Sequence, residues 1–229
     1  MDTMNIQELA SLLGRDAREL GKLANRGHLP GRKVGGEWRF SRAEIHRWLE
    51  QEMNRFSDQE LRNLEPANRN IDFKPVLSSL LPIESIDLNF PARTRNSALR
   101  ELVKLTEQSH RVWDPETILE AIIVREENGG TAHEEGFAIP HPHRRIPNTL
   151  GESVMAFGRA ASAIPFGGPR GSTTDLFFLL CCTEDRLHLR ALARLALVLR
   201  QESARAQLRA AQTPVEVLEV LDETERRIA

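Results

Sequence analysis

Two histidines stand in sequence contexts where an imidazole could act as a nucleophile. His141 follows the apolar segment Gly136–Pro140, and His188 lies near the start of the amphipathic segment Leu187–Leu199. The unperturbed pKa of histidine is about 6.5, so the ring is mostly neutral at neutral pH and has a lone pair available for covalent attack. Because proline cannot donate a ladder hydrogen bond, the predicted strand should stop at Pro140 and leave His141 at its end.

Two further features favour an anionic group beside these rings. His188 would lie near a helix N-terminus, where backbone N–H groups and the helix dipole favour negative charge. Arg125, near the end of a predicted helix, could bind a phosphate through its guanidinium fork. The alternative for Arg125 is a surface ion pair with Glu126 or Glu127.

Several short motifs around these residues recur in one known family. They are Arg125-Glu126, Thr131, the run Gly136-Phe137-Ala138-Ile139-Pro140-His141, the apolar run Asp175–Leu180, and His188-Leu189 with Leu192-Ala193. Together they resemble the fructose/mannitol-type enzyme IIA family of the bacterial phosphotransferase system, including its nitrogen-regulatory branch. The resemblance covers roughly Ile71–Thr224.

The resemblance implies a site and a partner. His141 would accept a phosphoryl group, assisted by His188 and Arg125, and a histidine phosphocarrier protein would donate it. No cofactor is expected. The implied fold is an α/β domain with a mixed central sheet flanked by helices.

Three alternatives stay open at this site. His143 follows in the sequence His141-Pro142-His143 and could be the acceptor instead. A His-x-His pair could also hold zinc or copper if His133 and His188 joined it, although two ligands alone do not make a site. The turn Thr131–Glu135 is acidic, and its carboxylates could repel phosphate and slow transfer.

Hydrophobic periodicity and turn signals predict a mixture of helices and strands in the second part of the chain. Asp114 with Pro115 is a helix start signal. The predicted helices are Ser97–Ser109, Asp114–Glu127, Leu187–Leu199, Ala204–Ala211 and Thr213–Leu221, and the predicted strands are Gly136–Pro140, Ser153–Gly158 and Asp175–Cys181. This alternation suggests one α/β domain over residues 71–229.

The segment before it has a different organisation. Helices are predicted at Asn5–Leu13 and Ala17–Asn25, and Gly35-Gly36 between Arg32–Val34 and Glu37–Phe40 is a two-residue hairpin signal. Ser41 with Glu44 predicts a capping box for a helix through Trp48 and Leu49. Residues 54–70 are polar and are predicted to be a linker, with a short helix at Asp58–Leu64.

Residues 1–53 resemble the excisionase-type, MerR-like helix-turn-helix family, with a winged hairpin after the recognition helix. The matching motifs are Glu8-Leu9-Ala10, Leu13-Gly14, Arg26–Pro30, Lys33–Phe40, and Ile45 with Trp48-Leu49. The helix that should meet DNA also carries the acids Asp16 and Glu19. Small helix-turn-helix modules serve as protein docking units too, and this alternative stays open.

Local charge supports DNA as a partner. Gly14–Arg42 contains eight basic and three acidic side chains, a balance of +5 in a chain of net charge −2. Such a patch suits phosphate contacts, which dominate affinity for DNA. Arg18 and Lys22, four residues apart, share a helix face that could enter a major groove. The candidate DNA-binding residues are Arg15, Arg18, Lys22, Arg26, Arg32 and Lys33.

Composition sets the remaining expectations. The 229 residues are 40% hydrophobic and 28% charged, as in globular proteins, and no apolar run is long enough for a membrane helix. The adjacent Cys181 and Cys182 are not expected to bridge, because one peptide rarely allows disulfide geometry. We expect a cytoplasmic protein without a membrane partner. A homodimer is open, since many helix-turn-helix proteins bind two-fold DNA sites.

The leading functional hypothesis is a phosphorylation-responsive regulator that joins an enzyme IIA domain to a DNA-binding module, with a regulated protein as a further candidate partner. It would be a phosphocarrier with a phosphohistidine intermediate rather than a metabolic enzyme. The alternatives are a sugar-specific phosphocarrier component of the phosphotransferase system, and an interaction protein that takes up no phosphate.

Overall fold

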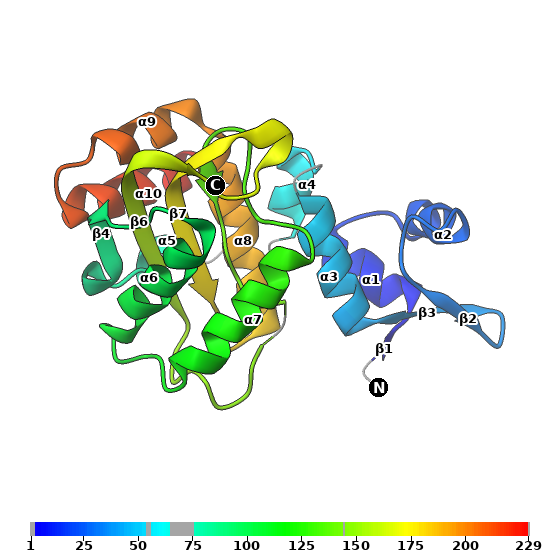
Figure 1. Cartoon of the computed structure of the whole chain (residues 1–229). Coiled ribbons are helices and arrows are strands. Elements are labelled where there is room, and N and C mark those ends of the chain that lie inside the picture. Colours follow the sequence, from blue (N-terminus) through cyan, green and yellow to red (C-terminus); the bar gives the residue numbers. More distant parts are fainter. Residues whose placement is uncertain (1–2, 54–55, 65–75, 144, 229) are drawn as a thin grey trace. The chain divides into compact units, whose positions relative to one another are not determined.

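The computed structural model describes residues 3–53, 56–64, 76–143 and 145–228 (Figure 1). The chain divides into two compact units, Met1–Asp72 and Phe73–Ala229. Among the described residues, no helix is both long enough and apolar enough to cross a lipid bilayer.

The N-terminal unit is a small helical bundle with an antiparallel sheet. Its elements are β1 (Thr3–Met4), α1 (Ile6–Leu13), α2 (Ala17–Asn25), β2 (Arg32–Val34), β3 (Glu37–Ser41), α3 (Arg42–Glu52) and α4 (Asp58–Asn63). The strand order is β1-β3-β2. Leu9, Leu20, Phe40 and Ile45 are fully buried, so both predicted helices and the predicted hairpin contribute to one core.

The predicted capping box at Ser41 is wrong. Ser41 is the last residue of β3, paired with Thr3, and α3 starts at the next residue. Its side chain makes no capping hydrogen bond. The pattern alone could not show that Ser41 already serves as a strand residue. A capping box does form at α1, between Asn5 and Glu8.

Part of the predicted linker is an ordered helix. α4 matches the short helix suggested at Asp58–Leu64, and it starts with a capping box between Ser57 and Glu60. Arg15 pairs with Glu60 at 3.4 Å, which ties α4 to the turn between α1 and α2. The linker prediction for residues 54–55 and 65–70 lies outside the described residues.

The C-terminal unit contains a four-stranded mixed sheet. The elements are α5 (Leu77–Leu80), β4 (Ile86–Phe90), α6 (Arg95–Glu107), α7 (Pro115–Glu127), β5 (Phe137–Ala138), β6 (Val154–Pro165), β7 (Thr173–Cys181), α8 (Asp185–Arg200), α9 (Glu202–Ala210) and α10 (Pro214–Ile228), with 3₁₀ turns at Ile83–Ser85 and Pro169–Gly171. The strand order is β4-β6-β7-β5. β6 and β7 are antiparallel, and the two outer pairs are parallel.

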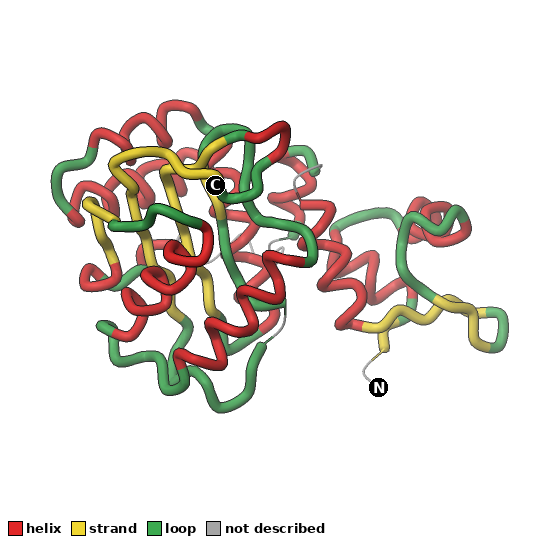
Figure 2. The backbone as a smooth tube through the Cα atoms, in the orientation of Figure 1, coloured by secondary structure: helices red, strands yellow, loops and turns green. Residues whose placement is uncertain are grey.

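Helices cover this sheet, as Figure 2 shows. α6 and α7 pack on one face through a core that includes Leu99, Leu102 and Ile122. Successive side chains of a strand point to opposite faces, so a sheet can carry helices on both of them. α8 contacts β7, and α10 packs against α8. The predicted α/β architecture with a mixed, helix-flanked sheet is therefore confirmed. Cys181 and Cys182 are both free and buried.

The strands differ from prediction in extent. β5 is two residues long instead of Gly136–Pro140, whereas β6 continues to Pro165. β4, with the sequence IDLNF, was not predicted. Only its first and last residues are buried, and it lies at the sheet edge, so it lacks the apolar run of β7.

A tight turn before β5 leads towards His141. Its two arms pair through an isolated bridge between Ala132 and Ala138 and a hydrogen bond from the His133 N–H to the Phe137 carbonyl, 2.8 Å long. The His133 ring stacks on Phe137 with centroids 4.1 Å apart. Burial lowers the pKa of His133 to about 4; Glu135 opposes this shift, and Arg200 adds to it.

We predict that His133 makes the protein acid-sensitive. Its folded pKa is depressed, so its contribution to stability is complete above the unfolded pKa of about 6.5 and is lost as pH falls towards about 4. Urea unfolding at pH 7 and pH 4.5 should show a loss about 2–3 kcal/mol larger for the wild type than for His133→Gln. Equal losses in both proteins would contradict the assignment.

We also predict that Gly158 in β6 cannot accept a side chain. A Cβ at this position would lie 2.6 Å from the ring of Phe90 in β4. Gly158→Ala should lower the free energy of unfolding by about 1–3 kcal/mol, as overpacked cores do. Urea unfolding measures it, with the exposed Ser162→Ala in the same strand as the control. Equal stability of the two variants would show that β4 does not pack as described.

Candidate functional site

His141 stands just beyond the end of β5, and the backbone around it is held on β7. The Leu180 N–H donates to the Pro140 carbonyl at 3.0 Å, so Pro140 accepts across the sheet although it cannot donate. His141 Nδ1 lies 2.7 Å from the Ile139 carbonyl oxygen. A carbonyl only accepts, so the proton must be on Nδ1, and the lone pair of the neutral ring is on Nε2.

His188 faces this ring from the first turn of α8. Its backbone N–H donates to the Glu184 carbonyl at 3.0 Å, as the fourth residue of a helix should. The ring centroids of His188 and His141 are 5.2 Å apart, with an angle of 61° between the ring planes. The structure therefore brings together two of the three predicted catalytic residues.

Arg125 lies in the last turn of α7 and is only 4% exposed. Within the described residues its Nε has no hydrogen-bond partner. The predicted alternative of a surface ion pair with Glu126 is wrong. Arg125 is buried, and the Glu126 carboxylate is engaged by Arg95 at 3.2 Å and by Thr131.

The other histidines near His141 in sequence behave differently. The stacked ring of His133 does not come close enough to those of His141 and His188 to share an ion with them. His143 is half-buried in the loop after Pro142. Glu134 in the acidic turn pairs with Arg170 at 3.3 Å on the exposed surface. This partner reduces the repulsion that Glu134 would exert on an incoming phosphate.

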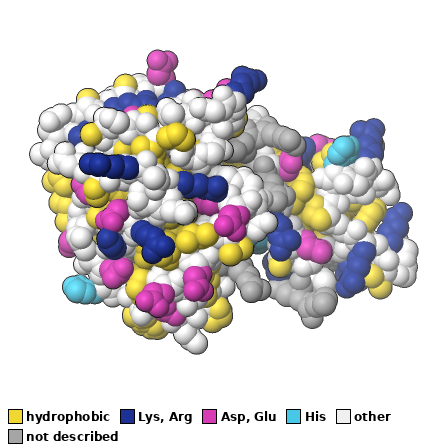
Figure 3. Space-filling model, in the orientation of Figure 1, with side chains coloured by type: hydrophobic (Ala, Val, Ile, Leu, Met, Phe, Trp, Pro, Cys, Tyr) yellow, Lys and Arg dark blue, Asp and Glu magenta, His cyan; other side chains and the backbone are white. Residues whose placement is uncertain are grey.

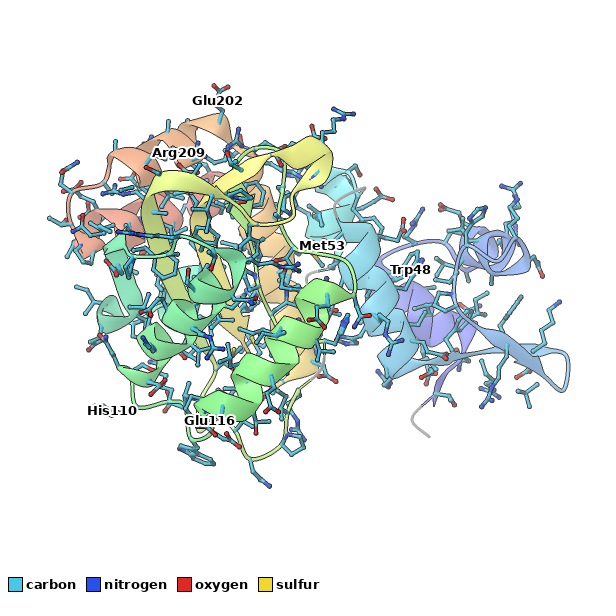
Figure 4. All side chains as sticks on the ribbon, in the orientation of Figure 1. Trp48, Met53, His110, Glu116, Glu202 and Arg209 are labelled. Atoms are coloured by element: carbon cyan, nitrogen blue, oxygen red, sulfur yellow. The ribbon has the colours of Figure 1, made fainter. Side chains whose placement is uncertain are left out.

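Arg209 on α9, labelled in Figure 4, anchors the same turn from the other side. It donates to both oxygens of the Asp175 carboxylate, at 2.7 and 2.8 Å, and to the Glu135 carbonyl at 3.1 Å. The Asp175 N–H donates to the Gly136 carbonyl at 3.0 Å. The start of β5 is therefore fixed to β7 by side-chain and backbone contacts, although neither Arg209 nor this clamp was predicted.

Of the predicted DNA-binding residues in the N-terminal unit, Arg18 and Lys22 lie on α2, Arg15 and Arg26 lie in the turns that flank it, and Arg32 and Lys33 lie on β2. Figure 3 shows Lys and Arg side chains gathered over this part of its surface. The exposed ones are Arg18, Lys22, Arg26, Arg32 and Lys33. Arg15 differs, because it is half-buried and pairs with both Glu19 and Glu60.

Aromatic residues support the hairpin and its connection to α2. Lys33 Nζ lies 5.3 Å from the centre of the Trp38 ring, and Trp38 stacks on Phe40 with centroids 5.9 Å apart. Trp48 on α3 (Figure 4) donates its indole N–H to the His28 carbonyl at 2.8 Å, which holds the turn after α2. The tryptophans thus brace the basic elements.

Comparison with known proteins assigns both units. Residues 79–224 match the family model of the phosphoenolpyruvate-dependent sugar phosphotransferase system, EIIA 2, and residues 3–53 match a helix-turn-helix domain model. The nitrogen regulatory protein of Bradyrhizobium diazoefficiens is 32% identical over 151 residues, covering 63% of this chain and 94% of that protein.

Two further comparisons show how similar the chain is to known proteins in sequence and in structure. The fructose-specific EIIABC component of Bacillus subtilis is 27% identical over 152 residues, covering 66% of this chain and 24% of that protein, so the chain spans about a quarter of that relative. The crystal structure of the nitrogen regulatory protein IIA-Ntr from Neisseria meningitidis superposes with a TM-score of 0.58 at 26% identity, covering 64% of this chain and 99% of that one.

The family match spans more than half of the chain and includes His141, His188 and Arg125. The chain therefore belongs to the enzyme IIA family of the phosphoenolpyruvate-dependent sugar phosphotransferase system, of the type that includes the nitrogen regulatory IIA proteins, with a helix-turn-helix domain at residues 3–53.

Proposed function

We propose that the C-terminal unit accepts a phosphoryl group on Nε2 of His141 from a histidine phosphocarrier protein, and that the protein is a phosphorylation-responsive regulator. The observation that carries the proposal is the 2.7 Å contact between His141 Nδ1 and the Ile139 carbonyl. It supports one tautomer, which keeps the nucleophilic lone pair on the opposite nitrogen.

The transfer step balances without an added proton or cofactor. The Nε2 lone pair of His141 attacks phosphorus in line with the P–N bond of the donor phosphohistidine. That bond breaks, and its electron pair returns to the donor nitrogen as the new P–N bond forms on His141. The donor ring carries a proton on its other nitrogen, so it leaves as a neutral imidazole. The His141 proton stays on Nδ1 throughout, so its contact with Ile139 stabilises both the free and the phosphorylated ring.

His188 and Arg125 are proposed to stabilise charge on the transferred group. Phosphoryl transfer depends mainly on positioning and on cationic or N–H groups directed at the equatorial oxygens. The His188 ring, 5.2 Å from that of His141, can donate an N–H to such an oxygen. Arg125 brings a buried guanidinium with an unused Nε–H. Both effects act on charge that develops during transfer.

Two features support a regulatory role over a transport step. The family domain is joined to a helix-turn-helix domain, and nitrogen regulatory proteins are among its relatives. A phosphohistidine adds about two negative charges, which can change the partner that a surface binds. The likeness to a fructose-specific EIIABC component keeps a sugar-specific phosphocarrier as the second candidate.

We predict that the protein takes up a single phosphate at His141. Phosphoenolpyruvate, enzyme I and the histidine phosphocarrier protein should add one phosphate, detected by intact mass spectrometry under mildly alkaline conditions. His141→Ala should remove the signal, because it removes the nucleophile. His143→Ala is the matched control and should retain it.

The other possible outcomes would indicate a different acceptor or a different function. Loss of the signal in His143→Ala alone would make His143 the acceptor. No uptake by the wild type from these donors would contradict the proposed phosphoryl transfer and favour a protein that acts by binding alone. Onward transfer from His141 to a sugar-specific enzyme IIB would favour the phosphocarrier candidate over the regulator.

We also propose that the N-terminal unit binds DNA through α2 and the β2–β3 hairpin. The exposed Arg18, Lys22, Arg26, Arg32 and Lys33 provide the phosphate contacts that such binding needs. Arg15 contributes less, since Glu19 and Glu60 already neutralise its charge. Glu19 on α2 pairs with Arg15, and the Asp16 side chain accepts from the backbone at the start of that helix.

We predict a salt-dependent affinity for duplex DNA. Replacing both Arg18 and Lys22 with Ala should weaken binding to a random-sequence duplex and lower the slope of log affinity against log salt by about 0.9 for each phosphate that is no longer neutralised. Fluorescence anisotropy at several salt concentrations measures it. Arg47→Ala, an exposed cation on α3, is the control. No binding at low salt would indicate a protein docking module instead.

A further inference from the structure

A chain of hydrogen bonds runs from the end of α7 to the His141 ring. Glu126, 2% exposed, accepts from Arg95 at 3.2 Å, from the Thr131 N–H at 3.2 Å, and from the Thr131 hydroxyl. The Thr131 carbonyl accepts from the Ile139 N–H at 3.3 Å. The Ile139 carbonyl then accepts from His141 Nδ1.

Ile139 is the residue through which this series of hydrogen bonds reaches the His141 ring. Its N–H is tied to Thr131 and its C=O is tied to His141, so the two contacts orient a single peptide segment. Thr131 itself is held by two bonds to one carboxylate, and that carboxylate is fixed by the guanidinium of Arg95 on α6. A shift of Thr131 would therefore move the carbonyl that determines the His141 tautomer.

We propose that Glu126 is a positioning residue for phosphoryl transfer, which it serves by fixing Thr131 and, through Ile139, the Nδ1–H tautomer of His141. This inference rests on the proposed function. The tautomer of His141 can nevertheless be measured whether or not the protein is phosphorylated. Glu126 does not touch the reacting atoms. It acts by keeping Nε2 as the nitrogen with the lone pair.

The contacts match an ionised carboxylate. All three groups directed at Glu126 are donors, and an ionised carboxylate is a pure acceptor. A glutamine would keep one oxygen for the Arg95 guanidinium and the Thr131 N–H, but its NH₂ group would have to donate to the Thr131 hydroxyl, which reverses that bond. It would also replace the ionised acceptor with a neutral one, and hydrogen bonds to a neutral group are weaker.

Ring nitrogen NMR on the ¹⁵N-labelled full chain tests the idea without any phosphate. In the wild type the neutral His141 ring should carry its proton on Nδ1. Glu126→Gln should shift the ring towards the Nε2–H tautomer and slow phosphoryl uptake roughly tenfold, the scale on which partners that orient a histidine ring act. Glu127→Gln, which removes the adjacent exposed charge, should leave both properties unchanged.

Thr131 supplies a second, milder pair of variants. Thr131→Val removes only the hydroxyl donor and should shift the tautomer in the same direction, whereas Thr131→Ser keeps the donor and should behave as the wild type. If Glu126→Gln fails to fold, the Thr131 pair decides. A wild-type tautomer in both Glu126→Gln and Thr131→Val would overturn the proposal. A tautomer shift in a protein that accepts no phosphate would support the positioning role and contradict the proposed function.

Discussion

The site depends on one short hydrogen bond, between His141 Nδ1 and the carbonyl of Ile139. An imidazole has two similar nitrogens, and only the unprotonated one is a nucleophile. The backbone carbonyl two residues earlier determines which nitrogen carries the proton, and it does so without adding a charged group to the site. The backbone that carries this carbonyl must then be rigid, and much of the surrounding structure provides that rigidity.

The peptide segment before His141 is held from both sides. On one side, β5 pairs with β7, and Pro140 accepts from Leu180. On the other side, the arm Thr131–His133 pairs with Phe137–Ile139, and Glu126 holds the start of that arm. A two-residue strand would be weak alone, because a pair of isolated strands is marginally stable. Here it gains its order from two neighbours.

Much of this arrangement could be predicted from the sequence, and the rest depended on contacts between distant residues. The sequence predicted a strand before His141, and this strand is present, although it ends at Ala138 rather than at Pro140. Helical spacing correctly placed His188 in the first turn of α8. Glu126 looked like a surface partner of Arg125, since nothing local shows that Arg95, 31 residues earlier, reaches its carboxylate. The Arg209–Asp175 clamp was missed for the same reason.

A local pattern also misled at the start of α3. Ser41 has the type and spacing of a helix cap and occupies the N-cap position, but its side chain makes no capping hydrogen bond. The short helix predicted at Asp58–Leu64 is present as α4, and a capping box and an ion pair to Arg15 attach it to the N-terminal unit. The polar composition of this segment could not show that ion pair, because Arg15 is distant in sequence.

The most direct test of the account is ³¹P and ¹⁵N NMR of the phosphorylated, ¹⁵N-labelled protein, which identifies the nitrogen bonded to phosphorus. We predict a single phosphoryl group on Nε2 of His141, with the proton retained on Nδ1. A phosphoryl group on Nδ1 of His141, or on His143, would contradict it.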